Sequence, residues 1–183
     1  EADVYDVHRY WGWYYNSFLT FLNLRDAGVW QNPSGEQAIT FTECVGNYTG
    51  VDGAYNLCSR TKQPGSQKCW TGHAPAADQP HDALEYQAFA LKNATEMFRR
   101  FRSSNRRLSG VMPFTIIFHN WDGISSFSEM KPKPAAYQYG VSYQPVLLSW
   151  ENWNYNAYAG NTVSTVLHIV NDDDFFRDLD GAE

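Results

Sequence analysis

The 183-residue sequence lacks both an excess of basic residues and a long apolar run. It has 14 Lys and Arg residues against 20 Asp and Glu residues, which gives a formal net charge of -6. Nucleic acids and anionic membranes bind basic surfaces, so neither is expected as the main partner. No stretch approaches the roughly 20 apolar residues of a membrane-spanning helix, and no targeting signal opens the chain. We therefore expect a soluble, globular product.

Cysteine is also scarce, since the only cysteines are Cys44, Cys58 and Cys69. An odd number leaves one thiol over, and a bridge between Cys58 and Cys69 would close a Gly/Pro-rich loop in an oxidising compartment. Such a bridge favours a periplasmic or extracellular location, which the sequence itself does not specify. Zinc needs about four ligands at short spacings, and neither the cysteines nor His73 and His81 provide them. We expect no metal and no cofactor.

Aromatic residues are abundant, at 16% of the chain, and hydrophobic residues make up 43%. This composition is enough for a packed core, and it is also typical of a surface that stacks flat ligands. One basic cluster lies where a long helix is expected to end, and there its cations would offset the helix dipole and hydrogen-bond the last carbonyls. Its members are Arg99, Arg100, Arg102, Arg106 and Arg107.

Strand and helix signals alternate along the first two thirds of the chain. Residues 3–10 carry β-formers, 17–24 are an apolar stretch of helical character, and 37–44 are a second strand with Glu43 at its C-terminal end. A long polar loop follows, from residue 46 to residue 80. The order predicted so far is therefore strand, helix, strand.

A second helix and a third strand follow the polar loop. Asp82 with Glu85 three residues later forms a capping box, so the helix is predicted to begin there. Its apolar residues recur at the spacing of one helical face and include Leu91 and Phe98. Residues 111–119 then form an apolar run that is typical of a strand buried on both faces of a parallel sheet.

This alternation predicts an α/β fold made of the last β/α units of a TIM (β/α)8 barrel, whose reactive groups follow the C-terminal strand ends. After a short helix at 135–143, residues 146–150 and 162–170 read as strands joined by a turn-rich segment. We predict two domains. Residues 1–143 are the C-terminal part of the barrel, and 144–183 are the truncated start of an immunoglobulin-like β-sandwich.

Three segments stand out, namely HRYWGWY from His8 to Tyr14, ITFTECVGN at 39–47 and KPKPAAY at 131–137. Together they resemble segments of glycoside hydrolase family 2, the β-galactosidase and β-glucuronidase group. The first is similar to that family's Asn-x-Tyr-x-Gly-Trp-Tyr segment, with His in place of the first Asn. The second is similar to the strand that carries the nucleophilic glutamate, and the third to the linker after the barrel. The segments occur in the family's order and span nearly the whole chain.

The resemblance implies a retaining β-glycosidase with Glu43 as nucleophile and Tyr10 hydrogen-bonded to its carboxylate. In this mechanism a second carboxylic acid protonates the leaving oxygen, and in the family that acid follows an asparagine on an earlier strand. No Asn-Glu pair occurs in this sequence. We therefore expect the acid/base residue to lie outside this chain.

Candidate substrate-binding residues lie near the expected strand ends. Aromatic faces stack on sugar rings and polar side chains bind hydroxyls, which points to His8, Trp11, His119, Asn120 and Trp121. The expected partner is a β-galactoside or related polysaccharide unit, and the parent enzyme is a candidate homo-oligomer. Two alternatives remain open: a carbohydrate-binding fragment in which Glu43 performs no attack, and a purely structural fragment.

Overall fold

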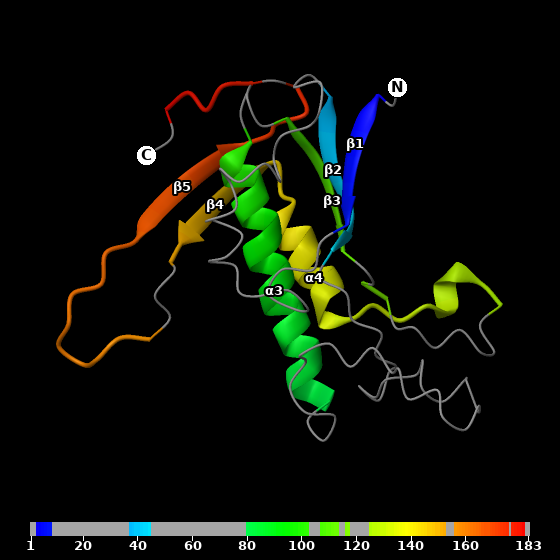
Figure 1. The fold of residues 1–183 in the computed structure, drawn as a ribbon, viewed down its shortest axis with the longest axis horizontal. Helices are drawn as coiled ribbons and strands as arrows, with labels where there is room; N and C mark the ends of the chain where they lie inside the picture. The colour runs from blue at the N-terminus through cyan, green and yellow to red at the C-terminus, as the bar shows by residue number, and fades with distance from the viewer. Residues whose placement is uncertain are drawn as a thin grey trace.

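The computed structural model describes residues 3–8, 37–44, 80–102, 107–113, 116–117, 125–152, 156–175 and 177–181. Two separate sheets and two α-helices account for most of the regular structure (Figure 1). In chain order the elements are β1 (Val4–His8), β2 (Ala38–Cys44), α3 (Pro80–Phe101), β3 (Leu108–Pro113), the 3-10 turn η1 (Phe127–Glu129), α4 (Pro134–Ser142), β4 (Val146–Glu151) and β5 (Val166–Asn171).

The first sheet is parallel and has the strand order β1-β2-β3. Parallel strands need a long connection between them, and α3 provides it between β2 and β3. Side chains alternate across the sheet, so Ile39 and Phe41 are buried on the side of α3 while Thr40 and Thr42 lie on the other side. The sheet therefore has one apolar face and one polar face.

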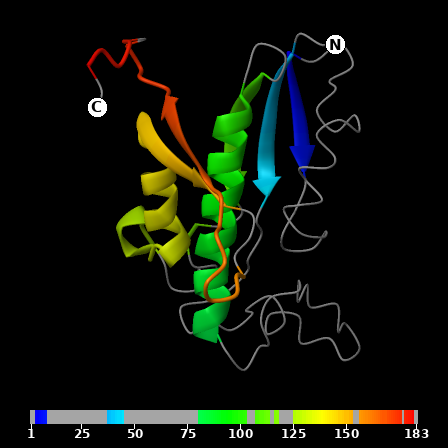
Figure 2. The same cartoon turned by 90° about the vertical axis from the view of Figure 1, so that its left-hand side faces the viewer.

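Helix α3 is the centre of the molecule and is covered on two sides. Figure 2 shows it standing between the first sheet and a layer formed by α4 and the β4–β5 hairpin. On the sheet side, the ring of Phe98 stacks on Phe41 with 4.4 Å between centroids. On the other side, Glu96 contacts β4 through Ser149. Burial on two sides explains why residues 94–98 are all buried, where the sequence pattern predicted a single buried face.

Helix α4 packs beside α3, and Tyr139 of α4 and Tyr143 directly after it hydrogen-bond the backbone of β3. The Val111 amide donates to the Tyr143 hydroxyl at 3.0 Å, and the Val111 carbonyl accepts from the hydroxyls of Tyr139 and Tyr143 at 2.5 and 3.1 Å. Burial, together with the neighbouring Tyr143, raises the pKa of Tyr139. These contacts satisfy backbone groups of a strand at the sheet edge, which would otherwise need another partner.

The β4–β5 hairpin is antiparallel and attaches to α3 through polar contacts. On its inner face Leu147 and Ser149 are buried, whereas on its outer face Leu148 and Trp150 are more than half exposed. The Arg99 guanidinium donates to the carbonyls of Ser142 and Gln144 and to the Asp172 carboxylate. Arg99 was expected to bind the last carbonyls of its own helix. It instead binds carbonyls at the end of α4, because α4 ends beside it.

Most of the predicted elements that fall in the described ranges are present, with three corrections at their ends. The last strand, β5, begins at Val166 instead of residue 162. Helix α3 begins at Pro80, so Asp82 lies within its first turn and does not precede it, consistent with proline's preference for the first helical position. The third strand begins at Leu108 instead of residue 111, and Met112 is 53% exposed, so the strand is not buried on both faces. Neither described helix is both long and apolar enough to cross a membrane.

The predicted helix at 17–24, the loop at 46–79 and the pair Cys58 and Cys69 lie outside the described residues. The barrel and the sandwich stay predictions, because three parallel strands and one hairpin are compatible with several larger folds.

Candidate active site

The parallel pairing of β1 and β2 brings their C-terminal ends together. His8 is the last residue of β1 and Glu43 lies one residue before the end of β2, and the register pairs these two residues directly. The Nδ1 atom of His8 lies 3.0 Å from the Oε2 atom of Glu43. Two residues that are 35 positions apart in sequence thus form one side-chain pair at the strand ends.

A β-bulge is what turns Glu43 toward this site. Strict alternation along β2 would place Glu43 on the buried face. However, β1 advances two residues from Asp6 to His8 while β2 advances three from Thr40 to Glu43, which is the signature of a bulge. The extra residue moves Glu43 to the polar face beside His8. Cys44, which is 1% exposed, takes the buried position in its place.

A second carboxylate holds His8 from the other side. The Nε2 atom of His8 lies 3.1 Å from Asp6 Oδ2 and 3.2 Å from the Thr42 hydroxyl. Asp6 in turn accepts hydrogen bonds from the Thr40 hydroxyl at 2.9 Å, from the Thr42 hydroxyl at 2.5 Å and from the Thr42 amide at 3.1 Å. The imidazole of His8 is therefore fixed between two carboxylates, and the threonines of the next strand fix Asp6.

The hydrogen bonds to Asp6 favour its ionised form. Burial acts in the opposite sense and raises its pKa, but the hydrogen bonds from Thr42 and Thr40 and the charge of His8 outweigh this effect. The pKa of Asp6 therefore lies below its ordinary value of 3.8. At neutral pH the site contains a fixed negative charge next to His8.

The pair remains accessible from the polar face of the sheet. The side chain of His8 is 53% exposed and that of Glu43 is 28% exposed. Within the described residues, Oε2 of Glu43 is held by His8 and no contact is seen at Oε1. A carboxylate with one oxygen anchored and one oxygen accessible can act as a nucleophile, as a general base or as a hydrogen-bond acceptor for a sugar hydroxyl.

The described residues bring together two of the residues that the sequence pointed to, His8 and Glu43. The other expected site residues lie outside the described ranges, namely Tyr10, Trp11, His119, Asn120 and Trp121. Sequence reasoning missed Asp6, Thr40 and Thr42. Their signal was nevertheless present, because the two-residue period of a strand places Asp6 on the same face as His8 and Thr40 on the same face as Thr42.

The neighbouring thiol is a poor candidate for chemistry here. Burial raises the pKa of Cys44 to about 12, and its thiol donates to the Met112 carbonyl at 3.6 Å, so it is not a reactive nucleophile. Across the described ranges, no group of three or more His, Cys, Asp and Glu side chains is arranged to hold a metal ion.

Comparison of the chain with known protein families, with curated proteins and with solved structures finds no match.

Proposed function

We propose that this chain carries the nucleophile of a retaining β-glycosidase that acts on β-galactosides or related polysaccharide units. The observation that carries the proposal is the placement of Glu43 at the C-terminal end of the central parallel strand, where the bulge turns it onto an accessible polar face beside His8. Reactive groups of β/α enzymes gather at this end of their strands. Residues 1–143 are proposed to belong to a TIM barrel, and 144–183 to an immunoglobulin-like sandwich.

In the proposed reaction, the Glu43 carboxylate attacks the anomeric carbon of the sugar through Oε1. The new bond to Glu43 forms as the bond between the anomeric carbon and the leaving oxygen breaks, and that oxygen takes a proton from a carboxylic acid. Water then hydrolyses the glycosyl-enzyme and restores both groups. The acid/base residue is proposed to lie on a segment outside these 183 residues, because the sequence contains no Asn-Glu pair.

His8 is proposed to position the nucleophile. Its Nδ1 atom contacts the Oε2 atom of Glu43 at 3.0 Å, so one carboxylate oxygen is held and the other is left to attack the sugar. Asp6 and Thr42 hold the opposite edge of the imidazole and prevent it from rotating away. Pre-orientation of this kind lowers the entropy that must be lost on reaching the transition state. Tyr10, Trp11, His119, Asn120 and Trp121 are proposed to complete the sugar site.

The test is to incubate the full-length protein with a panel of 2-fluoro glycosides, which trap the glycosyl-enzyme, and to map the labelled peptide by mass spectrometry. We expect the label on Glu43 and its loss in Glu43→Gln. Glu129→Gln is the matched control, because Glu129 is an exposed glutamate of the short turn η1 and contacts only nearby serines.

Label on Glu43 would also identify the sugar that the site prefers. Label on another residue, or hydrolysis without label, would rule Glu43 out as the nucleophile. Saturable sugar binding that is unaffected by Glu43→Gln, with no hydrolysis, would favour the carbohydrate-binding alternative.

A further inference from the structure

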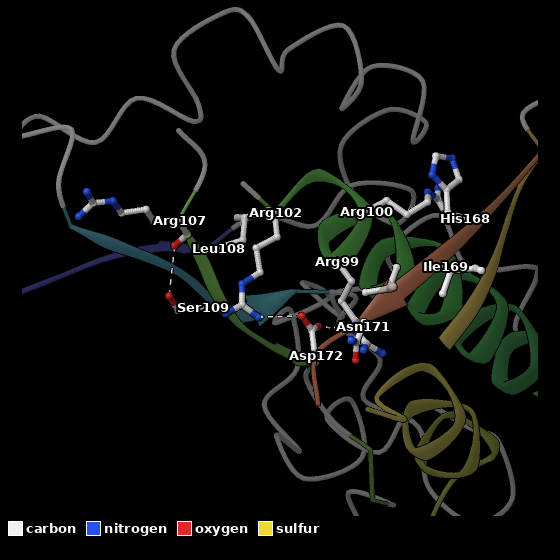
Figure 3. A pocket seen from close by; sticks show the side chains of 11 residues that line it. Arg99, Arg100, Arg102, Arg107, Leu108, Ser109, His168, Ile169, Asn171 and Asp172 are labelled. Carbon is white, nitrogen blue, oxygen red and sulfur yellow. Dashed lines mark hydrogen bonds and ion pairs between the residues drawn. The ribbon is translucent and has the colours of Figure 1, made fainter. Parts of the chain in front are cut away.

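A cavity of about 650 Å³ lies at the C-terminal end of α3, between the beginning of β3 and the strand β5. Figure 3 shows the side chains that line it, which come from these three elements. Because β3 begins here and the strands of its sheet are parallel, this cavity lies at the end of the sheet opposite to His8 and Glu43. It is therefore separate from the candidate active site.

Positive charge dominates the lining of this cavity. Among the lining residues that the structure describes, four are arginines and one, Asp172, is acidic. The excess is notable in a chain whose formal net charge is -6. The Arg102 side chain is 56% exposed, so its guanidinium is accessible from solvent. A concave surface lined by one sign of charge concentrates ligands of the opposite sign.

The carboxylate of Asp172 shows how the arginines of this cavity can bind an oxyanion. Arg99 donates from Nε to one oxygen of Asp172 at 3.0 Å, and Arg102 donates from Nη1 to the other oxygen at 3.2 Å. Figure 3 shows both side chains pointing toward Asp172. The Arg99 side chain is only 8% exposed and also binds carbonyl groups around the end of α4, so it is held rigidly. A guanidinium group has five donors, so Arg102 retains donors for a second anion.

The size and chemistry of the cavity restrict the ligand. A volume of about 650 Å³ falls within the ~300–1,000 Å³ of small-molecule sites, so it can hold more than an inorganic ion. The described part of the lining contains no Phe, Tyr or Trp, so it offers no aromatic platform of the kind on which nucleobases stack. Arg100, Ser109, His168 and Asn171 add polar groups that can bind hydroxyls.

We infer that this cavity is an anion-binding site for a sugar-sized polar molecule that carries a phosphate or sulfate group, with Arg102 as its main contact. The inference does not depend on the glycosidase proposal, because the cavity shares no residue with that site.

The test measures binding to the whole chain by isothermal titration and by amide chemical shifts of Ser109 and Ile169. The probes are inorganic phosphate, glucose 6-phosphate, glucose 6-sulfate and uncharged glucose. We expect saturable binding of the two esters, weaker binding of inorganic phosphate and none of glucose. Absence of saturable binding by either ester, equal binding of glucose, or no advantage of the esters over inorganic phosphate would overturn the inference.

Two substitutions of opposite expected effect separate a ligand site from a purely structural ion pair. Arg102→Gln should raise the Kd of glucose 6-phosphate about tenfold, because it removes a charged donor. Asp172→Asn should lower that Kd about tenfold, because it removes the competing internal carboxylate. Arg177→Gln is the matched control, since Arg177 also pairs with an aspartate, Asp173, but does not line this cavity.

Equal weakening by all three substitutions, or weakening by Asp172→Asn, would assign the arginines to a structural role alone. Circular dichroism of each variant checks that the chain remains folded. If Asp172→Asn lowers the melting temperature, recovery of that temperature on addition of glucose 6-phosphate supports the inference and lack of recovery contradicts it.

Discussion

Two polar networks of similar composition occupy opposite sides of the molecule. On the sheet, the Asp6 carboxylate accepts hydrogen bonds from the hydroxyls of Thr40 and Thr42 and contacts the imidazole of His8. Between α3 and the hairpin, the Glu96 carboxylate accepts from Ser149 at 2.8 Å and from Lys92, and Ser149 accepts from Arg100 at 2.6 Å. The first network is open to solvent, whereas Glu96 is 2% and Ser149 is 0% exposed.

Because the two networks differ in burial, we expect them to have different roles. A buried carboxylate without its partners would be costly, so the Glu96 network fixes how the hairpin sits on α3. An exposed network contributes little to stability, since water replaces each lost contact, but its groups can reach a ligand. We therefore expect substitutions in the buried network to affect folding and those in the exposed network to affect function.

The largest expected effect is on catalysis. Glu43→Gln should reduce turnover by the full-length enzyme at least about 1,000-fold, because the amide cannot form the glycosyl-enzyme. The free energy of unfolding should change by less than about 0.5 kcal/mol, since the side chain is partly exposed. Rate assays and denaturant titration of the same variant measure both quantities. If Glu43→Gln destabilises the protein but leaves turnover unchanged, Glu43 has a structural role and not a catalytic one.

The next effect is on stability. Glu96→Ala should lower the free energy of unfolding by about 3 kcal/mol, because Ser149, Ser142 and Lys92 lose their shared acceptor. The comparison is Glu129→Ala, which removes a carboxylate whose contacts in the described ranges are exposed serines, so the free energy of unfolding should stay close to that of the wild type. Urea denaturation of both variants measures the difference, and equal costs would show that burial does not separate the two regions.

A pair of hydroxyl deletions sharpens the comparison further. Ser149→Ala should cost about 2 kcal/mol, since it removes a fully buried link between Arg100 and Glu96. Thr42→Val keeps the shape of the side chain and should cost less than about 1 kcal/mol, because Asp6 retains the Thr40 hydroxyl and the Thr42 amide. Thermal unfolding of the two variants gives the ranking, and the reverse order would contradict it.

The smallest effect is the pH dependence that Asp6 contributes. Its pKa in the folded protein is lowered from 3.8, so the folded state favours the ionised carboxyl. The resulting stabilisation is complete above 3.8 and is lost as the pH falls through the lower folded pKa. Unfolding measured between pH 2 and pH 6 should show a shallower loss of stability in acid for Asp6→Asn than for the wild type. Identical slopes would exclude Asp6 as a contributor.

Sequence patterns predicted much of the secondary structure in the described ranges, because those patterns are local. Short runs of β-forming residues located β1 and β2, and the apolar spacing located α3. The start of α3 and the start of β3 were predicted incorrectly, since Pro80 opens the helix and the pairing of Ile39 with Leu108 extends the strand. The Arg-lined cavity could not be predicted, because it forms only where β5 returns to the end of α3.

For the candidate site, the residue types at the strand ends, including His8 and Glu43, follow from the sequence alone. That Glu43 faces His8 follows from the fold, because a β-bulge reverses the side on which strict alternation would place Glu43. The fold likewise explains why Arg99 binds the end of α4 and Asp172. The physical reason is that local pattern fixes the period of a strand or helix, whereas register, bulges and the packing of distant segments fix which side chains meet.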